Sequence, residues 1–124
     1  MTESSQINKL ASAARRLGQL FENAGHKRKN LERTMRKLKA QGLIYATTHM
    51  RDQKYLYLLH PSKAGEQRKR EYIGTDTKRI DAAIKSIERG KSYDALHKQL
   101  KSVDVAISEA SHMLAEAVGV LEKL

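Results

Sequence analysis

The chain has 124 residues, of which 40% are hydrophobic, and its formal net charge is +10. It has no cysteine, which excludes a disulfide framework, a thiolate nucleophile and a cysteine-based zinc site. No apolar run approaches the ~20 residues that span a bilayer, and the first residues do not resemble a signal peptide. We therefore expect a soluble, unprocessed cytoplasmic protein with one compact domain, or a small head and a long helix.

The positive charge is concentrated in one stretch, residues 26–70. This stretch holds 13 Lys and Arg against three acids, whereas the other 79 residues hold 11 residues of each sign. A local surplus of this kind attracts polyanions and gains affinity from the release of their counterions. Nucleic acid is the first partner that the sequence indicates.

Two helices are predicted in the N-terminal third. Apolar residues recur at steps of three and four over residues 5–23, which predicts an amphipathic helix that ends at Gly25. A second helix is expected to begin at residue 27 or 30 and to end at Gln41, with Gly42 as its cap. Its polar side presents four cations spaced i, i+4, i+7 and i+8: Lys29, Arg33, Arg36 and Lys37.

Short β-strands are predicted in the middle of the chain. Residues 43–48 and 54–59 are rich in side chains that suit a pleated surface, and the polar residues 50–53 between them predict a hairpin turn. Pro61 ends the second strand, and residues 70–73 predict a third. A three-stranded antiparallel meander is the economical arrangement.

Two more helices are predicted in the C-terminal part. The first begins at Thr75 or Asp76 as its N-cap and ends at Gly90, and Ser92 caps the second. The second carries a heptad pattern of apolar residues, typical of a coiled coil, to the end of the chain. This apolar seam consists of Leu96, Leu100, Val103, Ile107, Ala110, Leu114, Ala117, Leu121 and Leu124.

The length of the last helix predicts self-association. A helix of this length exceeds the size of a compact 124-residue domain, so part of the apolar seam projects and requires a partner. We expect a second copy of the chain to be that partner, in parallel or antiparallel orientation. The alternative is that the helix folds back on the helices of its own chain.

The expected fold class is α+β and mainly helical. It comprises two helices, the meander and two further helices, of which the last is coiled-coil-like. We expect a basic head over residues 1–74 and a helical dimerisation region over residues 75–124.

Residues 30–59 show a characteristic order of elements: a helix, a glycine, a short strand, a polar turn and a second strand. The helix ends in Gly42-Leu43-Ile44, and the hairpin returns through residues 55–59. This segment resembles the second half of a winged-helix DNA-binding domain, and the resemblance covers under a third of the chain. It implies a recognition helix in the major groove and a wing whose cations contact phosphates or the minor groove.

A second, weaker resemblance concerns residues 55–74. This segment is similar to hairpins found in small proteins of phages, plasmids and transposons, which suggests a mobile-element setting.

Nucleic-acid contacts are expected from side chains of the basic stretch, with duplex DNA favoured over RNA. They are Lys27, Arg28, Lys29, Arg33, Thr34, Arg36, Lys37, Arg51, Lys54, Lys63, Arg68, Lys69 and Arg70. Three tyrosines of the strands are able to stack on unpaired bases, but their place among Leu and Ile favours core packing. These tyrosines are Tyr55, Tyr57 and Tyr72.

Catalysis and metal binding are not indicated. The sequence has no Gly-rich phosphate loop and no local nucleophilic motif, and its five histidines lack the spacing of metal ligands. We expect a dimeric, non-enzymatic DNA-binding regulator or architectural factor without cofactors, associated with the nucleoid. The alternative is a protein-interaction module of a mobile element that inhibits or recruits an acidic protein or a ribonucleoprotein.

Overall fold

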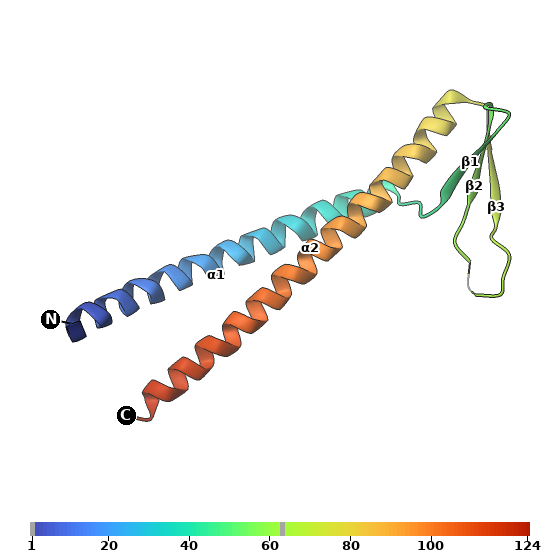
Figure 1. Cartoon of the computed structure of the whole chain (residues 1–124). Coiled ribbons are helices and arrows are strands. Elements are labelled where there is room, and N and C mark those ends of the chain that lie inside the picture. Colours follow the sequence, from blue (N-terminus) through green and yellow to red (C-terminus); the bar gives the residue numbers. More distant parts are fainter. Residues whose placement is uncertain (1, 63) are drawn as a thin grey trace. The chain divides into compact units, whose positions relative to one another are not determined.

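The computed structural model describes residues 2–62 and 64–124. Its elements are, in chain order, α1 (Thr2–Gln41), β1 (Thr47–Arg51), β2 (Tyr55–Leu59), β3 (Arg70–Gly74) and α2 (Thr77–Glu122) (Figure 1). The mainly helical α+β class and the three-stranded antiparallel meander are confirmed. Along the chain, the described segments contain one helix before the three strands and one after them. The prediction of two helices before and two after the strands is therefore wrong. None of the described helices meets the length and apolarity needed to cross a membrane.

Helix α1 is continuous for 40 residues. The predicted break at Gly25 is wrong, because a glycine inside a helix costs about 1 kcal/mol, whereas ending one helix and nucleating another costs more. The end at Gly42 is confirmed, since this glycine has φ of 103° and its N–H donates to the Lys39 carbonyl at 3.2 Å. Arg89 of α2 donates to the carbonyls of Gln41 and Gly42, which satisfies acceptors at the end of α1.

Helix α2 begins as predicted but does not break where predicted. The Asp76 carboxylate accepts from the N–H of Lys78 at 3.2 Å, which confirms the N-cap. The predicted stop at Gly90 and cap at Ser92 are wrong, because both residues lie inside α2. Gly90 is buried, and a Cβ at this position would lie 2.8 Å from the Ile44 carbonyl oxygen. The glycine therefore allows the segment before β1 to approach α2 closely.

The sheet has the strand order β1-β2-β3. β1 pairs with β2 in register from Thr47 opposite Leu59 to Arg51 opposite Tyr55, and the pairing of β2 with β3 has a bulge between Leu56 and Tyr57. In the turn that joins β1 and β2, Asp52 and Gln53 both have positive φ, as in the type I′ turns that match strand twist. The predicted hairpin is confirmed.

One face of the sheet packs on the first part of α2. Leu56 and Leu58 alternate along β2 with Tyr55 and Tyr57 and are the most deeply buried large side chains described. Together with residues of β3 and α2 they form a cluster of Leu56, Leu58, Ile73, Ala83 and Ile87, against which Ile44, Ala46 and Ile80 pack.

The chain divides into two compact units. The sheet unit is Thr34–His97, and the helical unit joins the chain up to Arg33 with Lys98–Leu124. In the helical unit, Arg28 Nε donates to Asp104 Oδ1 at 2.6 Å, which connects α1 to α2. This hydrogen bond, followed by the charges of Asp104 and Glu32, raises the pKa of Arg28. The predicted functional division after Gly74 stays a prediction.

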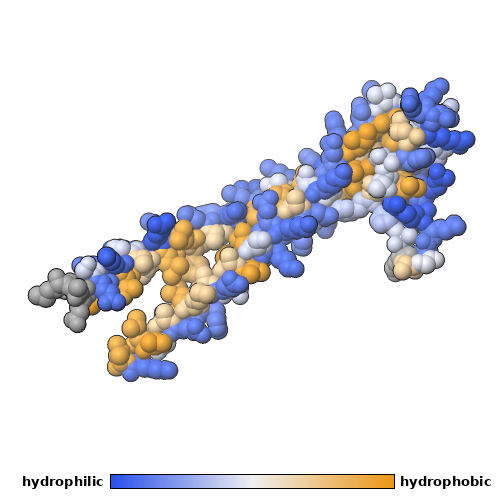
Figure 2. All heavy atoms as spheres, in the orientation of Figure 1, coloured by the Kyte–Doolittle hydropathy of each residue, from blue (hydrophilic) through white to orange (hydrophobic). Residues whose placement is uncertain are grey.

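The exposure of the predicted apolar seam changes along α2. Its earlier members in the helical unit, from Leu100 to Ala110, are half-buried, whereas its members from Leu114 onward are exposed. Apolar side chains gather along both helices of this unit (Figure 2). The outer part of the seam is thus left without cover by the residues that the structure describes.

Candidate nucleic-acid interface

Four of the predicted contact residues share one exposed face of α1. Lys29, Arg33, Arg36 and Lys37 follow the pitch of this unbroken helix, and we call them the basic helix face. Within residues 2–62 and 64–124 none of the four forms an ion pair with an acid. The one acid between residues 26 and 41, Glu32, pairs instead with Arg28 at 2.5 Å. The basic helix face therefore keeps its full positive charge toward solvent.

Arg28 stands apart from this face. Its guanidinium contacts both Asp104 and Glu32, so its charge is compensated within the helical unit. Lys27 is exposed on the same helix, and Thr34 is exposed at the start of the sheet unit.

The predicted cations of the sheet unit occupy different positions. Arg51 and Lys54 are exposed and flank the β1–β2 turn. Lys69 is exposed in the loop that precedes β3, and Arg70 begins that strand. Lys63, which was also predicted to contact nucleic acid, lies outside the described residues.

Arg68 has a structural role that the sequence did not reveal. Its guanidinium donates to Thr47 Oγ1 at 2.8 Å, to the Leu59 carbonyl at 3.1 Å and to the His60 carbonyl at 3.3 Å. Three such hydrogen bonds attach the loop after β2 to the first two strands. Arg68 can still attract a phosphate, but its orientation is determined by these contacts.

The expectation that the strand tyrosines pack in the core is wrong. Tyr72 is 52% exposed, and Tyr55 and Tyr57 lie on the opposite side of β2 from Leu56 and Leu58. Strand register gives this side of the sheet, the outer face, a defined set of residues. The set is Thr47, His49, Arg51, Tyr55, Tyr57, Leu59, Arg70 and Tyr72.

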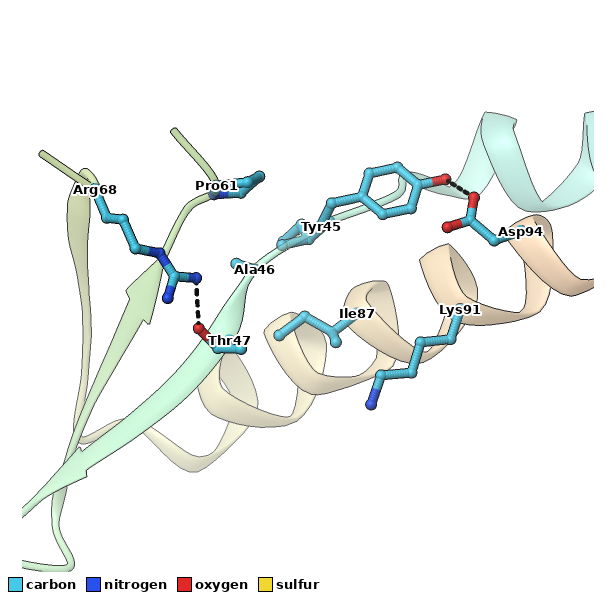
Figure 3. Close-up of a pocket in the computed structure, with 9 residues that line it drawn as sticks. Tyr45, Ala46, Thr47, Pro61, Arg68, Ile87, Lys91 and Asp94 are labelled. Carbon is cyan, nitrogen blue, oxygen red and sulfur yellow. Dashed lines mark hydrogen bonds between the residues drawn. The ribbon is translucent and has the colours of Figure 1, made fainter. Parts of the chain in front are cut away.

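A pocket of about 320 Å³ lies in the sheet unit between the start of β1 and α2. Tyr45 Oη donates to Asp94 Oδ1 at 3.1 Å at one end of it, and Arg68 reaches Thr47 at the other (Figure 3). Partial burial, followed by the hydrogen bond to Asp94, raises the pKa of Tyr45. Its lining residues contain no nucleophile–base pair, and apolar side chains such as Ile87 form much of the wall. Sequence spacing carries no signal of this pocket.

The described parts of the chain contain no cluster of side chains suited to bind a metal ion. No three His, Asp or Glu side chains gather there as potential ligands. His60 contacts Glu71 at 3.0 Å and His112 contacts Glu116 at 3.3 Å, each as an isolated pair.

Comparisons with protein-family models, with curated proteins and with solved structures found no match to this chain.

Proposed function

We propose that this protein is a non-enzymatic nucleic-acid-binding protein that contacts duplex DNA through the basic helix face and acts as a small regulator or architectural factor. The observation that carries this proposal is the concentration of four exposed cations, without ion pairs to described acids, on one side of a continuous helix. A major groove about 12 Å wide admits one α-helix, and Arg or Lys in it donates to guanine O6 and N7 or to phosphates.

The cations that flank the β1–β2 turn provide a second set of contacts. Arg51 and Lys54 are exposed at the tip of a hairpin, as a wing that touches phosphates requires. The resemblance to winged-helix proteins remains part of this proposal. In this chain, however, a single continuous helix precedes the hairpin.

Self-association belongs to the same proposal. Large apolar side chains of the helical unit are exposed, and each would contribute at most about 1.5–3 kcal/mol if it were buried completely. A dimer would cover them and would present two basic helix faces to two half-sites. These side chains are Ile7, Leu10, Leu20, Val105, Met113, Leu114, Val118, Val120, Leu121 and Leu124.

Substitution of the basic helix face tests the proposal. The triple variant Arg33→Ala, Arg36→Ala, Lys37→Ala should bind a labelled random DNA duplex much more weakly in fluorescence anisotropy. If all three contact phosphates, the slope of log K against log salt should also fall by roughly 3. The proposal is wrong if the affinity and the slope of this variant equal those of the wild type.

A charge-matched control separates location from net charge. Lys78→Ala, Arg79→Ala, Lys85→Ala removes three exposed cations of α2 in the sheet unit. This variant should retain most of the affinity. Equal losses in both variants would show that net charge alone, and not the basic helix face, attracts the DNA.

The exposed apolar side chains also favour a second candidate, a module that binds another protein or a ribonucleoprotein. Exposed apolar patches on this scale mark interaction surfaces, and their occupant could be a different chain. A pull-down with and without nuclease distinguishes the candidates, because a direct protein partner survives nuclease treatment whereas a partner held through nucleic acid does not.

A further inference from the structure

The outer face of the sheet combines one exposed and two half-buried aromatic rings with positive charge. The rings of Tyr57 and Tyr72 are paired across β2 and β3, with centroids 5.0 Å apart and a 46° angle between their planes. Tyr55 continues the row along β2, about 6.7 Å from Tyr57 at the usual rise of a strand. The sheet unit thus presents three tyrosines on the side that α2 does not cover.

Cations lie over two of these rings. The Arg70 guanidinium lies 5.5 Å from the centroid of the Tyr57 ring, and Lys54 Nζ lies 5.9 Å from that of Tyr55. Arg51 is the cross-strand neighbour of Tyr55. The eight residues of the outer face include no acid, because Glu71 belongs to the other side and contacts His60.

This combination suits a chain of unpaired bases. Every base has a π-face that stacks on an aromatic ring, while neighbouring cations attract the phosphates. Sheets that recognise single strands commonly stack two or three bases on aromatic side chains. A base pair inside a duplex offers no free face for stacking. This surface therefore requires unpaired bases, whereas the basic helix face is proposed to bind duplex DNA.

We infer that the outer face of the sheet binds an unpaired stretch of DNA strand by stacking a base on the exposed ring of Tyr72, which Tyr57 supports, with Arg70, Arg51 and Lys54 on the phosphates. The choice of DNA as the polymer rests on the proposed function, because stacking and phosphate contacts do not use the 2′-hydroxyl. The surface itself is separate from the helix that is proposed to enter the duplex.

The test uses the full chain and a labelled oligothymidine of about 12 nucleotides, within the site sizes usual for such surfaces. Tyr72→Ala should weaken binding about 5- to 150-fold, which corresponds to the usual 1–3 kcal/mol for loss of one stacked base. Tyr72→Phe retains the ring and should stay close to the wild type. Binding of both variants is followed by fluorescence anisotropy, with circular dichroism to show that they fold.

Met50 provides the matched control. It is 46% exposed in the same sheet, but strand alternation places it on the opposite side from Tyr72. Met50→Ala should therefore bind oligothymidine as the wild type does. If Tyr72→Ala does not fold, Arg70→Gln tests the same face and should also weaken binding.

The duplex probe makes the two proposals distinguishable. Tyr72→Ala should lose affinity for oligothymidine and retain affinity for duplex DNA, and the basic helix face variant should lose duplex affinity. The inference is overturned if the wild type does not bind oligothymidine, if Tyr72→Ala equals Met50→Ala, or if Tyr72→Ala loses duplex affinity in parallel. Tighter binding of an equivalent RNA strand than of DNA would overturn the assignment to DNA. Failure of duplex binding alone would overturn the proposed function and leave the Tyr72-dependent binding intact.

Discussion

The sheet unit contains nearly all of the buried apolar side chains that are described, whereas the helical unit contains most of the exposed ones. In the sheet unit, Leu58 is completely buried between the strands and α2. In the helical unit, Met113 and Leu121 are 67% and 66% exposed. A buried cluster stabilises its own unit, whereas exposed apolar surface costs about 25 cal/mol for each Å² in contact with water. The proposed self-association would bury this exposed surface of the helical unit, whereas the sheet unit already has its own buried cluster.

Breaking the predicted self-association should give the largest effect. Leu114→Glu with Leu121→Glu places two charges on the exposed part of the apolar seam. Loss of two buried leucines should weaken a dimer at least about a hundredfold, as measured by sedimentation equilibrium. The paired variant Ser108→Glu with Ala115→Glu has the same spacing and charge on another side of α2 and should remain dimeric. A wild type that is monomeric at all concentrations would show that the helical unit needs no second copy.

Truncation of one leucine in each unit compares them directly. Leu58→Ala should lower the free energy of unfolding by about 2–5 kcal/mol, because it leaves a cavity in a closed cluster. Leu121→Ala, at a protein concentration low enough to keep the chain monomeric, should change it by at most about 0.5 kcal/mol. Urea denaturation followed by circular dichroism measures both values. Similar costs for the two variants would contradict the difference in burial between the units.

Substitution of one helical glycine in each unit compares how closely the backbone of each unit is packed. Gly25→Ala in the helical unit should stabilise the chain by about 0.5–1 kcal/mol, because no atom of another segment lies within 4 Å of the added Cβ. Gly90→Ala in the sheet unit should destabilise it by about 1–3 kcal/mol, because its Cβ would lie 2.8 Å from the Ile44 carbonyl. Thermal unfolding of the two variants should shift in opposite directions. Two shifts of the same sign would mean that helix propensity alone decides both sites.

These glycines also show what local sequence patterns can and cannot predict. Gly25 and Gly90 look like helix ends, but a helix continues through a glycine when the residues on both sides favour helix or when another segment packs there. Gly42 follows the same local rule and does end its helix. At Gly90 the difference depends on a tertiary contact, the approach of Ile44, which local sequence does not specify.

The candidate site was predictable in part. The spacing of Lys29, Arg33 and Arg36 places them on one side of any helix, so the basic helix face follows from sequence. The outer face did not follow, because both Tyr and Leu suit a strand and their alternation leaves open which side is buried. A usable signal was present, since in the alternation Tyr55-Leu56-Tyr57 the wholly apolar side chain is expected inside. The bonds of Arg68 to Thr47 join segments distant in sequence and had no local signal.

The smallest effect concerns the edge of the sheet unit, where Tyr45 holds the segment before β1 against α2 through Asp94. Partial burial and this hydrogen bond raise the pKa of Tyr45 above its ordinary 10.0, so the folded state retains the proton more tightly than the unfolded state. The resulting stabilisation is present below pH 10 and is lost as pH rises through the raised pKa. Tyr45→Phe lacks the titrating group. The difference in unfolding free energy between the wild type and this variant should therefore be constant from about pH 7 to 9, and it should decrease at higher pH. A difference that stays constant up to about pH 11 would show that this contact does not couple the proton to folding.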